Sequence, residues 1–261
     1  MVRPQHHVAD PLVAGATRVT LAAADGSAIV GTYMASKADR APAVLLLHGN
    51  GSSRAQFENL APWLAAHGYA TLAIDFRGHG ESAQVARSFG LFEARDAKAA
   101  FDWLKAKQGG ARIGIVGTSL GGASALLGKD GPLPADALVL QAVYPDMRRA
   151  IRNRITAKAG GVIAKVAEPL LSFQSRPRFG VWPDAISPVT ALPVYAGPVM
   201  IIGGALDQYT PPSESSQMAH SARHLERLWL VEGLDHEAVT TLDSSTYRAA
   251  LLAYFDRRLR S

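Results

Sequence analysis

A serine between two glycines is the first feature of the chain that could do chemistry. The pentapeptide Gly117-Thr118-Ser119-Leu120-Gly121 follows an apolar run, residues 112–116, and leads into a stretch of small residues. A sharp turn between a strand and a helix lifts a serine hydroxyl clear of a sheet, and a side chain at either glycine position would collide with the neighbouring elements. The spacing therefore predicts Ser119 as a nucleophile.

A serine hydroxyl reacts poorly near neutral pH, so it needs a base within hydrogen-bond reach and an acid that holds the base in the correct tautomer. His236 lies in a short turn after the last apolar run of the chain, and Asp207 lies in a loop after the run before it. Where the nucleophile lies on a turn between a strand and a helix, the triad residues occur along the chain in the order Ser, Asp, His, as they do here. We predict that Ser119, Asp207 and His236 form a catalytic triad.

Other acids and histidines compete for these roles. Asp146 follows an earlier strand and stays an alternative to Asp207, whereas Asp235 adjoins His236, and neighbouring side chains generally diverge. Asp184 is a third rival to Asp207. His48 lies at a strand end, but in a turn whose role we assign to the backbone. The remaining histidines lie in the N-terminal tail, in or beside predicted helices, or in a separate turn: His6, His7, His67, His79, His220 and His224.

Acyl transfer passes through an oxyanion, which two backbone N–H groups can stabilise. One N–H group belongs to the residue after the nucleophile, here Leu120. The other comes from an earlier loop, where an apolar run leads into His48-Gly49-Asn50-Gly51. Glycines on both sides keep the approach to substrate open. We therefore predict the N–H of Asn50 as the second donor, with Gly51 as second choice.

The loop of residues 75–82 is dense in turn-forming residues. Its Ser82 has no glycine two places later and lacks the strand and helix that a nucleophilic serine requires, so we reject it as a nucleophile. We expect this loop to have a structural role, with Arg77 held by a carboxylate or by carbonyl groups.

The apolar runs predict an α/β fold. Residues 17–23 and 28–34 read as a hairpin joined by an Asp-Gly turn. The later runs have the continuous apolar character of strands buried on both faces: 44–47, 70–74, 113–116, 137–143, 199–202 and 228–231. Helical patterns separate most of them: 53–67, 92–108, 120–128, 213–220 and 245–259. We expect a mostly parallel eight-stranded sheet with an N-terminal antiparallel hairpin and helices on both faces.

Residues 146–197 form the one irregular block, predicted as a basic helix followed by a Pro-rich extended portion. Met147, Ile151 and Ile155 recur at four-residue spacing in the helix. We interpret the block as a small cap or a connecting insertion. Residues 146–180 hold eight basic and two acidic residues, a net charge of +6, whereas the whole chain carries +5. This charge fits a solvated helix face, an acidic substrate or weak contact with an anionic membrane.

Length and composition limit the remaining possibilities. With 261 residues and 48% hydrophobic content, we expect a tail of residues 1–16 and a single domain of residues 17–261. The lack of cysteine excludes a disulfide scaffold, a thiol nucleophile and thiolate metal ligands. Residues 1–7 lack the apolar core of a signal peptide, and no apolar stretch is long enough to span a bilayer. We expect a soluble protein, with the cytoplasm favoured.

Taken together, these motifs resemble those of α/β-hydrolase-fold serine hydrolases, from about residue 17 to residue 259. The matching motifs are the His48-Gly49-Asn50-Gly51 turn, the 75–82 loop, the 117–122 elbow, the Asp207 loop and the Gly233-Leu234-Asp235-His236 turn. Within the family the chain resembles the small-capped esterase and thioesterase-like branch, from which it departs at Leu206 and Asp235. The resemblance implies a triad of Ser119, Asp207 and His236, with oxyanion amides from Asn50 and Leu120.

We therefore expect hydrolysis of a small-molecule ester or thioester through an acyl-enzyme on Ser119. Amide or peptide cleavage, or perhydrolysis, on the same triad is the alternative within enzymes. A non-catalytic binding protein of the same fold is the alternative outside them. We expect no metal, no organic cofactor and no nucleic-acid partner. The sequence leaves the oligomeric state, the acyl chain length and the leaving group open.

Overall fold

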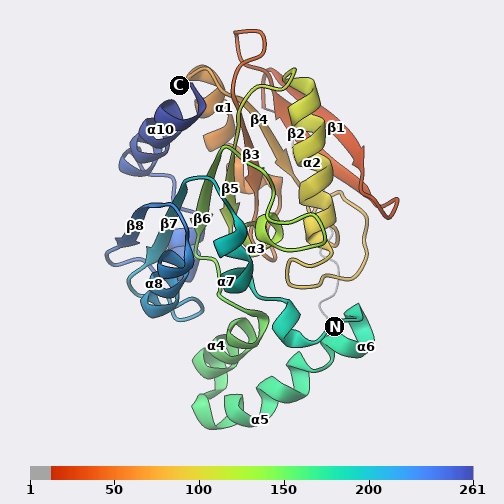
Figure 1. Ribbon diagram of the computed structural model, residues 1–261, viewed down its shortest axis with the longest axis vertical. Helices are drawn as coiled ribbons and strands as arrows, with labels where there is room; N and C mark the ends of the chain where they lie inside the picture. Colours follow the sequence, from red (N-terminus) through yellow and green to blue (C-terminus); the bar gives the residue numbers. More distant parts are fainter. Residues whose placement is uncertain (1–12, 261) are drawn as a thin grey trace.

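An eight-stranded sheet in the order β1-β2-β4-β3-β5-β6-β7-β8 forms the centre of the molecule (Figure 1). The structure is a computed structural model that describes residues 13–260. The strands are β1 (Ala16–Ala22), β2 (Ala28–Met34), β3 (Ala43–Leu47), β4 (Ala70–Ile74), β5 (Ile113–Thr118), β6 (Ala137–Gln141), β7 (Val199–Gly204) and β8 (Leu225–Val231). β2 pairs antiparallel with β1 and β4, and all the other pairs are parallel. The predicted fold class is confirmed.

Helices and short 3₁₀ segments connect the strands. They are η1 (Arg54–Phe57), α1 (Leu60–Ala66), α2 (Glu93–Lys107), α3 (Leu120–Leu126), α4 (Met147–Ala159), α5 (Gly161–Ser172), α6 (Ser175–Phe179), η2 (Pro183–Ala185), α7 (Pro188–Ala191), η3 (Leu192–Val194), α8 (Pro212–Ser221), α9 (His236–Thr240) and α10 (Ser245–Leu259). The predicted tail of residues 1–16 lies mostly outside the described residues, because β1 begins at Ala16 and residues 1–12 are not described. Among residues 13–260, no helix has both the length and the apolar character needed to cross a bilayer.

The sheet separates two apolar layers. Leu45 and Leu47 of β3 pack in the layer that contains α2 and α3, whereas Val44 and Leu46 pack in the layer that contains α1 and α10. All four side chains are fully buried. A strand with apolar partners on both faces has no reason to alternate with polar residues, which explains the continuous apolar runs of the sequence.

The strand register aligns the loops that carry the candidate site. Leu47, at the end of β3, pairs with Ile74 at the end of β4 and with Gly117 near the end of β5. Thr118 in turn pairs with Gln141 at the end of β6. The loops that leave these parallel strands therefore begin at one rim, where ligands bind in open α/β sheets.

The predicted helix of residues 53–67 is divided into η1 and α1. Pro62 is the third residue of α1, which begins at Leu60. The first four N–H groups of a helix have no acceptor within it, so a proline at this position costs no helical hydrogen bond. The preceding turn is fixed separately, because the backbone N–H of Arg54 donates a 2.7 Å hydrogen bond to Asp75 Oδ1.

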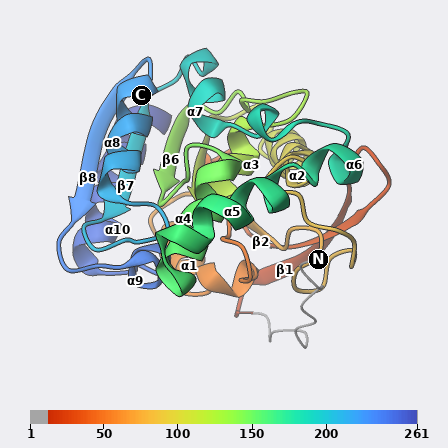
Figure 2. The ribbon, with the colours of Figure 1, turned by 90° about the horizontal axis from the view of Figure 1, so that it is seen from below.

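The segment after α4 corrects the predicted extended portion, which was wrong for residues 161–179. These residues form α5 and α6, and only beyond Gly180 does the chain become short turns. Gly160, with φ of 84°, separates α4 from α5 and lets the chain reverse. Seen from below, α4 and α5 lie across the middle of the molecule (Figure 2). We call α4, α5 and α6 the cap.

Candidate active site

Ser119 lies on a strained turn between β5 and α3. Its backbone has φ of 48° and ψ of −108°, a combination that side chains other than glycine rarely adopt. The Ser119 N–H donates a 2.8 Å hydrogen bond to the carbonyl of Gln141, which fixes the turn against the end of β6. Only 2% of the residue is exposed. The backbone of Ser119 is therefore fixed at the rim of the sheet.

The glycines around Ser119 are required by close packing. A Cβ atom at Gly121 would collide with the carbonyl oxygen of Leu47, the last residue of β3. A Cβ atom at Gly117 would lie 2.5 Å from the Cα atom of Gly122. The G-x-S-x-G spacing is thus the sequence signature of a turn that is pressed against the neighbouring strand.

The loop after β3 lies beside Ser119. A Cβ atom at Gly49 would be only 3.8 Å from the Cβ atom of Ser119. Asn50, Ser119 and Leu120 line one cavity. Leu120 is the first residue of α3, so its N–H has no acceptor four residues earlier within the helix. The predicted nucleophile and the residues predicted to supply oxyanion amides therefore face one space.

His48 fixes the orientation of the peptide between Gly49 and Asn50. Its Nδ1–H donates a 2.7 Å hydrogen bond to the Gly49 carbonyl, and its Nε2 accepts a 3.0 Å hydrogen bond from the N–H of Phe76. In a trans peptide the N–H points away from the C=O, so the Asn50 N–H is directed opposite to His48. Burial lowers the pKa of His48 to about 4, which keeps the ring neutral and both bonds intact at neutral pH.

His79 takes up the N–H group of Gly51, the second choice for the oxyanion donor. The Gly51 N–H donates a 3.0 Å hydrogen bond to His79 Nε2, while His79 Nδ1–H donates to the carbonyl of Arg77 at 3.0 Å. Burial, together with the neighbouring His48 and Arg87, lowers the pKa of His79 to about 3. With the Gly51 amide engaged, the Asn50 amide is the donor of this loop that suits an oxyanion.

Carboxylates anchor the loop of residues 75–82. Arg77 Nη2 donates to Asp96 Oδ1 at 2.6 Å, and Arg77 Nη1 donates to Asp25 Oδ2 at 2.7 Å. Ser82 Oγ donates to the carbonyl of Asp75 at 2.6 Å and accepts the N–H of Val30 at 2.8 Å. The loop therefore packs as a structural support for the imidazole of His79, and Ser82 is engaged in holding it.

The structure brings the predicted acid and base together. His236 Nδ1–H donates a 2.7 Å hydrogen bond to Asp207 Oδ2, and the N–H groups of Tyr209 and Thr210 each donate to Asp207 Oδ1 at 2.8 Å. The carboxylate is fully buried, whereas 13% of the imidazole side chain is exposed. This arrangement fixes the ring and leaves Nε2 as the proton acceptor.

The rival acids have other roles. Asp146 caps α4 by accepting the N–H of Arg149 at 2.8 Å, and Asp235 caps α9 by accepting the N–H of Ala238 at 2.9 Å. Asp184 is an exposed residue of η2. None of these three carboxylates makes a hydrogen bond to His236 within the described residues.

Ser119 and His236 are not in hydrogen-bond contact. Among residues 13–260, no hydrogen bond joins the Ser119 hydroxyl to the imidazole, and His236 lines a second cavity with Tyr209 and Ala157. Both cavities border α4, through Arg154 in the first and Ala157 in the second. Catalytic hydrogen bonds are often long in proteins without substrate and shorten when substrate binds.

A half-buried amide links three segments of the site. Gln56 Oε1 accepts the N–H of Gly49 at 3.1 Å, while its Nε2 donates to Thr118 Oγ1 at 3.2 Å and to the carbonyl of Thr240 at 3.0 Å. These partners belong to the Asn50 loop, to the strand before Ser119 and to the helix that begins at His236. Gln56 thus holds the three predicted functional segments in register.

Gln141 makes a similar connection on the other side of Ser119. Its backbone carbonyl accepts the Ser119 N–H, its Nε2 donates to the carbonyl of Val239, and its Oε1 accepts the Tyr247 hydroxyl at 2.8 Å. Sequence reasoning missed both glutamines. An isolated glutamine carries no motif, and its partners are distant in the chain.

Four further residues line the Ser119 cavity and were also missed: Arg87, Phe89, Tyr144 and Arg154. Phe89 has φ of 56°, and its carbonyl accepts the Tyr144 hydroxyl at 2.9 Å. Tyr144 follows β6, so its place after a strand was the one available signal. Arg87 and Phe89 lie in a loop and Arg154 lies in α4, and no sequence motif identifies any of the three as a site residue.

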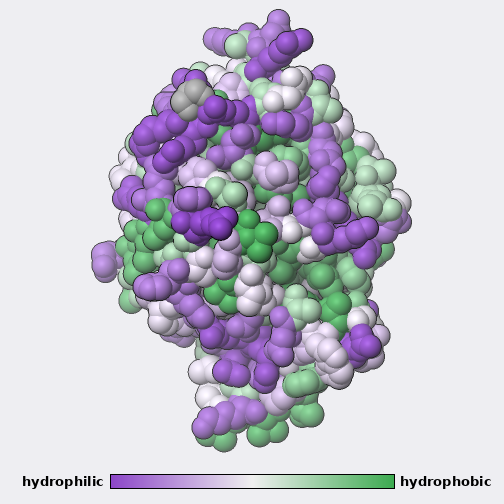
Figure 3. All heavy atoms as spheres, viewed as in Figure 1, coloured by the Kyte–Doolittle hydropathy of each residue, from purple (hydrophilic) through white to green (hydrophobic). Residues whose placement is uncertain are grey.

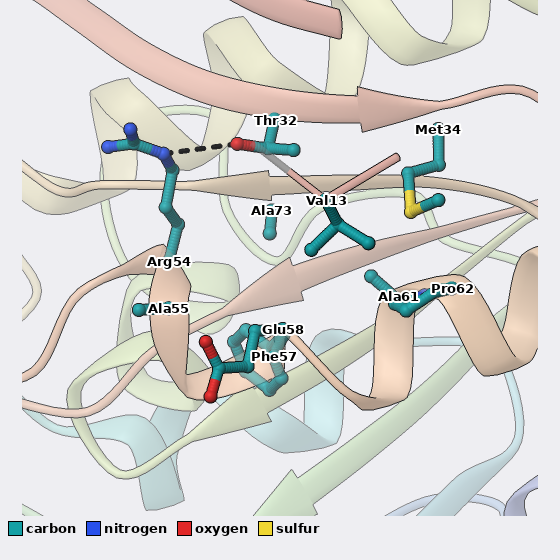
Figure 4. A pocket seen from close by; sticks show the side chains of 10 residues that line it. All are labelled: Val13, Thr32, Met34, Arg54, Ala55, Phe57, Glu58, Ala61, Pro62 and Ala73. Atoms are coloured by element: carbon teal, nitrogen blue, oxygen red, sulfur yellow. Dashed lines mark hydrogen bonds between the residues drawn. The ribbon is translucent and has the colours of Figure 1, made fainter. Parts of the chain in front are cut away.

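A different, small pocket lies between β2 and the segment η1–α1 (Figure 4). Arg54 Nε donates to Thr32 Oγ1 there at 3.1 Å, and the other side chains that line it are mostly apolar. Its lining residues include neither a serine nor a histidine, so they offer no nucleophile with a histidine base. Within residues 13–260, no group of three or more His, Asp or Glu side chains could hold a metal ion.

Comparison with known proteins places the chain in a family. An uncharacterised protein of Mycobacterium tuberculosis is 28% identical over 222 residues, which cover 84% of this chain and 72% of the relative. Lysophosphatidylserine lipase ABHD12 of Rattus norvegicus is 31% identical over 127 residues, 46% of this chain and 31% of the relative. Esterase Pf2001 of Pyrococcus furiosus shares the fold with a TM-score of 0.76 at 21% identity, over 99% of this chain and 100% of the esterase.

A family model with the description "serine aminopeptidase, S33" matches residues 38–178, more than half of the chain. This segment includes the Asn50 loop, the Ser119 turn and most of the cap. The chain therefore belongs to the serine aminopeptidase S33 family of α/β hydrolases.

Proposed function

We propose that this hydrolase cleaves carboxylic esters or thioesters through an acyl-enzyme on Ser119. The hydrogen bond between His236 and Asp207 carries the proposal, because it fixes the imidazole at the same sheet rim as the strained Ser119 turn. The peptide orientation at Asn50 supports it, since a donor that is aimed before substrate arrives stabilises the oxyanion without reorganisation.

In the proposed reaction, Ser119 Oγ attacks the carbonyl carbon and His236 Nε2 takes the hydroxyl proton. The N–H groups of Asn50 and Leu120 stabilise the oxyanion. When the tetrahedral intermediate collapses, the bond to the leaving group breaks and His236 gives its proton to the departing oxygen or sulfur. Water then attacks the acyl-enzyme with His236 again as base, which releases the acid and restores Ser119. The reaction requires substrate binding to bring His236 into contact with Ser119.

The charge of the cavity supports a preference for anionic substrates. Arg87 and Arg154 line it beside Ser119, and the residues that line it include no carboxylate. Arg87 Nη1 donates to Asn50 Oδ1 at 3.2 Å, which places a guanidinium next to the predicted oxyanion loop. We propose that the acyl or leaving group carries a carboxylate or phosphate near the scissile bond.

Amide cleavage is the second candidate, because the family description names an aminopeptidase and the same residues would act on an amide. Two measurements test the proposal: the first tests Ser119 as the nucleophile, and the second separates ester from amide cleavage. Ser119→Ala should abolish labelling by a fluorophosphonate and lower kcat for p-nitrophenyl esters by roughly 10⁴- to 10⁶-fold with the fold intact. A panel of such esters, from acetate to palmitate, is then compared with aminoacyl p-nitroanilides.

Faster turnover of the anilides would establish the peptidase. Absence of both labelling and turnover would favour a non-catalytic binding protein. Near-normal ester hydrolysis by Ser119→Ala would contradict the assignment of the nucleophile.

A further inference from the structure

Helix α5 exposes its large apolar side chains and buries small or polar ones, the reverse of a helix that packs on a core. Its buried residues are Ala164, Glu168 and Ser172, which recur every four positions and offer little apolar surface. The large apolar side chains of the helix and of the residue that ends it point outward: Val162, Ile163, Val166, Leu170, Leu171 and Phe173. We call these six residues the apolar cap face. Surface helices of globular proteins normally turn their apolar stripe to the core.

Ion pairs fix this orientation. Glu168 Oε1 accepts a 2.9 Å hydrogen bond from Arg148 Nε, and Glu168 Oε2 accepts bonds from Arg148 Nη2 at 3.2 Å and Arg152 Nη2 at 3.3 Å. Both arginines belong to α4. Rotating α5 to bury its apolar side would break these contacts, so the exposure of the apolar cap face is built into the packing of the two helices.

Exposed apolar side chains are concentrated here. Of the twelve large hydrophobic residues that are exposed among residues 13–260, seven lie between residues 162 and 182. Val162 is 81% exposed and Leu170 is 67% exposed. The seventh, Trp182, lies with its ring 6.0 Å from that of Phe173. Figure 3 shows hydrophobic residues gathered at the lower tip of the molecule, where Figure 1 places α5. A patch of this kind marks an interaction surface.

Four exposed basic side chains of the cap helices form what we call the basic rim. Lys158, Lys165, Arg176 and Arg178 are exposed, and the guanidinium of Arg176 lies 5.6 Å from the ring centre of Trp182. Apolar side chains flanked by lysine, arginine and tryptophan are typical of a surface that enters the headgroup region of a bilayer. Two copies of this protein that met through the same face would bring like charges together, which disfavours self-association there.

We propose that the apolar cap face and its basic rim bind the surface of an anionic lipid bilayer. The apolar side chains enter the boundary between headgroups and acyl chains, and the rim pairs with lipid phosphates and carboxylates. α4 lies between this surface and the Ser119 cavity, since Glu168 contacts its Arg148 while its Arg154 lines the cavity. The bound protein would therefore present the site near a source of acyl lipids.

Co-sedimentation of the full chain with vesicles tests the proposal without any need for catalysis. We expect binding to phosphatidylcholine vesicles that contain about 30% phosphatidylserine, and weaker binding as salt rises toward about 0.5 M. The double variant Val166→Ser/Leu170→Ser should lower the partition coefficient by about tenfold or more. Val194→Ser, at an equally exposed site on η3, is the matched control and should bind as the unmodified protein does.

A second double variant tests the rim. Lys165→Gln/Arg178→Gln should lower the partition coefficient into anionic vesicles by roughly fivefold for each charge removed. Binding to vesicles of pure phosphatidylcholine should change little. Thermal melting checks that every variant folds, and hydrolysis of p-nitrophenyl butyrate in vesicle-free solution should be unaffected, because these side chains line neither cavity of the site.

Two results would overturn the proposal. One is the absence of vesicle binding at low salt. The other is a dimer in sedimentation velocity that Val166→Ser/Leu170→Ser dissociates, with vesicle binding equal in the variant and the unmodified protein. The second result would assign the apolar cap face to another copy of the chain. Neither result bears on the role of Ser119, which the fluorophosphonate experiment measures separately.

Discussion

The side-chain oxygen of Gln56 lies 3.1 Å from the backbone nitrogen of Gly49 and accepts its hydrogen bond. The same amide donates to Thr118 and to Thr240. One side chain outside the predicted triad thus contacts the Asn50 loop, the strand before Ser119 and the last residue of α9 from a single position. A side-chain amide that makes all of these hydrogen bonds at once holds such segments more tightly than separate contacts would.

Replacing Gln56 should therefore reduce turnover more than substrate binding. We expect Gln56→Ala to lower kcat by about 10- to 100-fold with a smaller change in KM, because a shift of the oxyanion loop relative to Ser119 weakens the transition state. Gln56→Glu keeps the acceptor for the Gly49 N–H but loses the donors to Thr118 and Thr240. Its kcat should therefore lie between that of the unmodified protein and that of Gln56→Ala. Steady-state kinetics on p-nitrophenyl butyrate measures this. A kcat that stays unchanged in Gln56→Ala would show that Gln56 only stabilises the fold.

The hydrogen bond between Asp207 and His236 gives a second prediction. Asp207→Asn should lower kcat by about 10⁴-fold, because the amide favours the wrong tautomer of the imidazole. Asp146→Asn and Asp235→Asn are matched controls at the two helix caps, and their kcat values should stay within about threefold while stability falls slightly. A larger loss of kcat in Asp146→Asn than in Asp207→Asn would transfer the role of the acid to Asp146.

Arg154 should determine the preference for charged substrates. We expect Arg154→Gln to lower kcat/KM by about tenfold for a p-nitrophenyl ester whose acyl chain ends in a carboxylate, because a charge-assisted hydrogen bond is lost. The value for a neutral ester of equal length should stay within about twofold. Lys158→Gln, one turn further along α4, controls for the change in overall charge. Equal losses on both esters would mean that Arg154 shapes the cavity without recognising charge.

Acid should destabilise the fold through His48 and His79. A histidine in the unfolded chain titrates near pH 6.5, whereas burial lowers the pKa values of these two to about 4 and about 3. Between these values the unfolded chain binds more protons, so the free energy of unfolding falls as the pH falls, by up to about 1.4 kcal/mol per pH unit for each histidine. This stabilisation is fully present above pH 6.5.

Chemical denaturation at several pH values between 4 and 7 measures the effect. His79→Gln removes one of the titrating groups and should give a shallower loss of stability with acid, although the variant is less stable at neutral pH. His220→Gln, at an exposed position of α8, is the matched control. Parallel pH profiles for His79→Gln and the unmodified protein would contradict the assignment.

Much of the fold could be read from the sequence because the strands are buried on both faces. Continuous apolar runs such as residues 43–47 and 70–74 leave little doubt about strand positions, and glycine or polar turns mark their ends. The cap could not be read in this way. α5 buries Glu168 and exposes Val166 and Leu170, the reverse of the pattern that identifies a helix against a core, and Pro169 within it suggests an extended segment.

The candidate site was predictable only where a local motif marks it. Gly117 and Gly121 frame Ser119 because their backbone packs against neighbours, and Asp207 and His236 follow the ends of β7 and β8. Gln56 carries no such mark, since its partner Thr240 lies 184 residues away along the chain. The contact between Ser119 and His236 depends on the approach of two loops and stays a prediction.

The placement of His48 ties catalysis to folding. The imidazole that aims the Asn50 amide makes both of its hydrogen bonds in the neutral form, with Phe76 on one side and Gly49 on the other. A proton on Nε2 would cost the enzyme its oxyanion donor and the protein part of its interior in the same step. We therefore expect protonation of His48 to remove the oxyanion donor and the tertiary structure together, so that no folded form with a charged His48 is active.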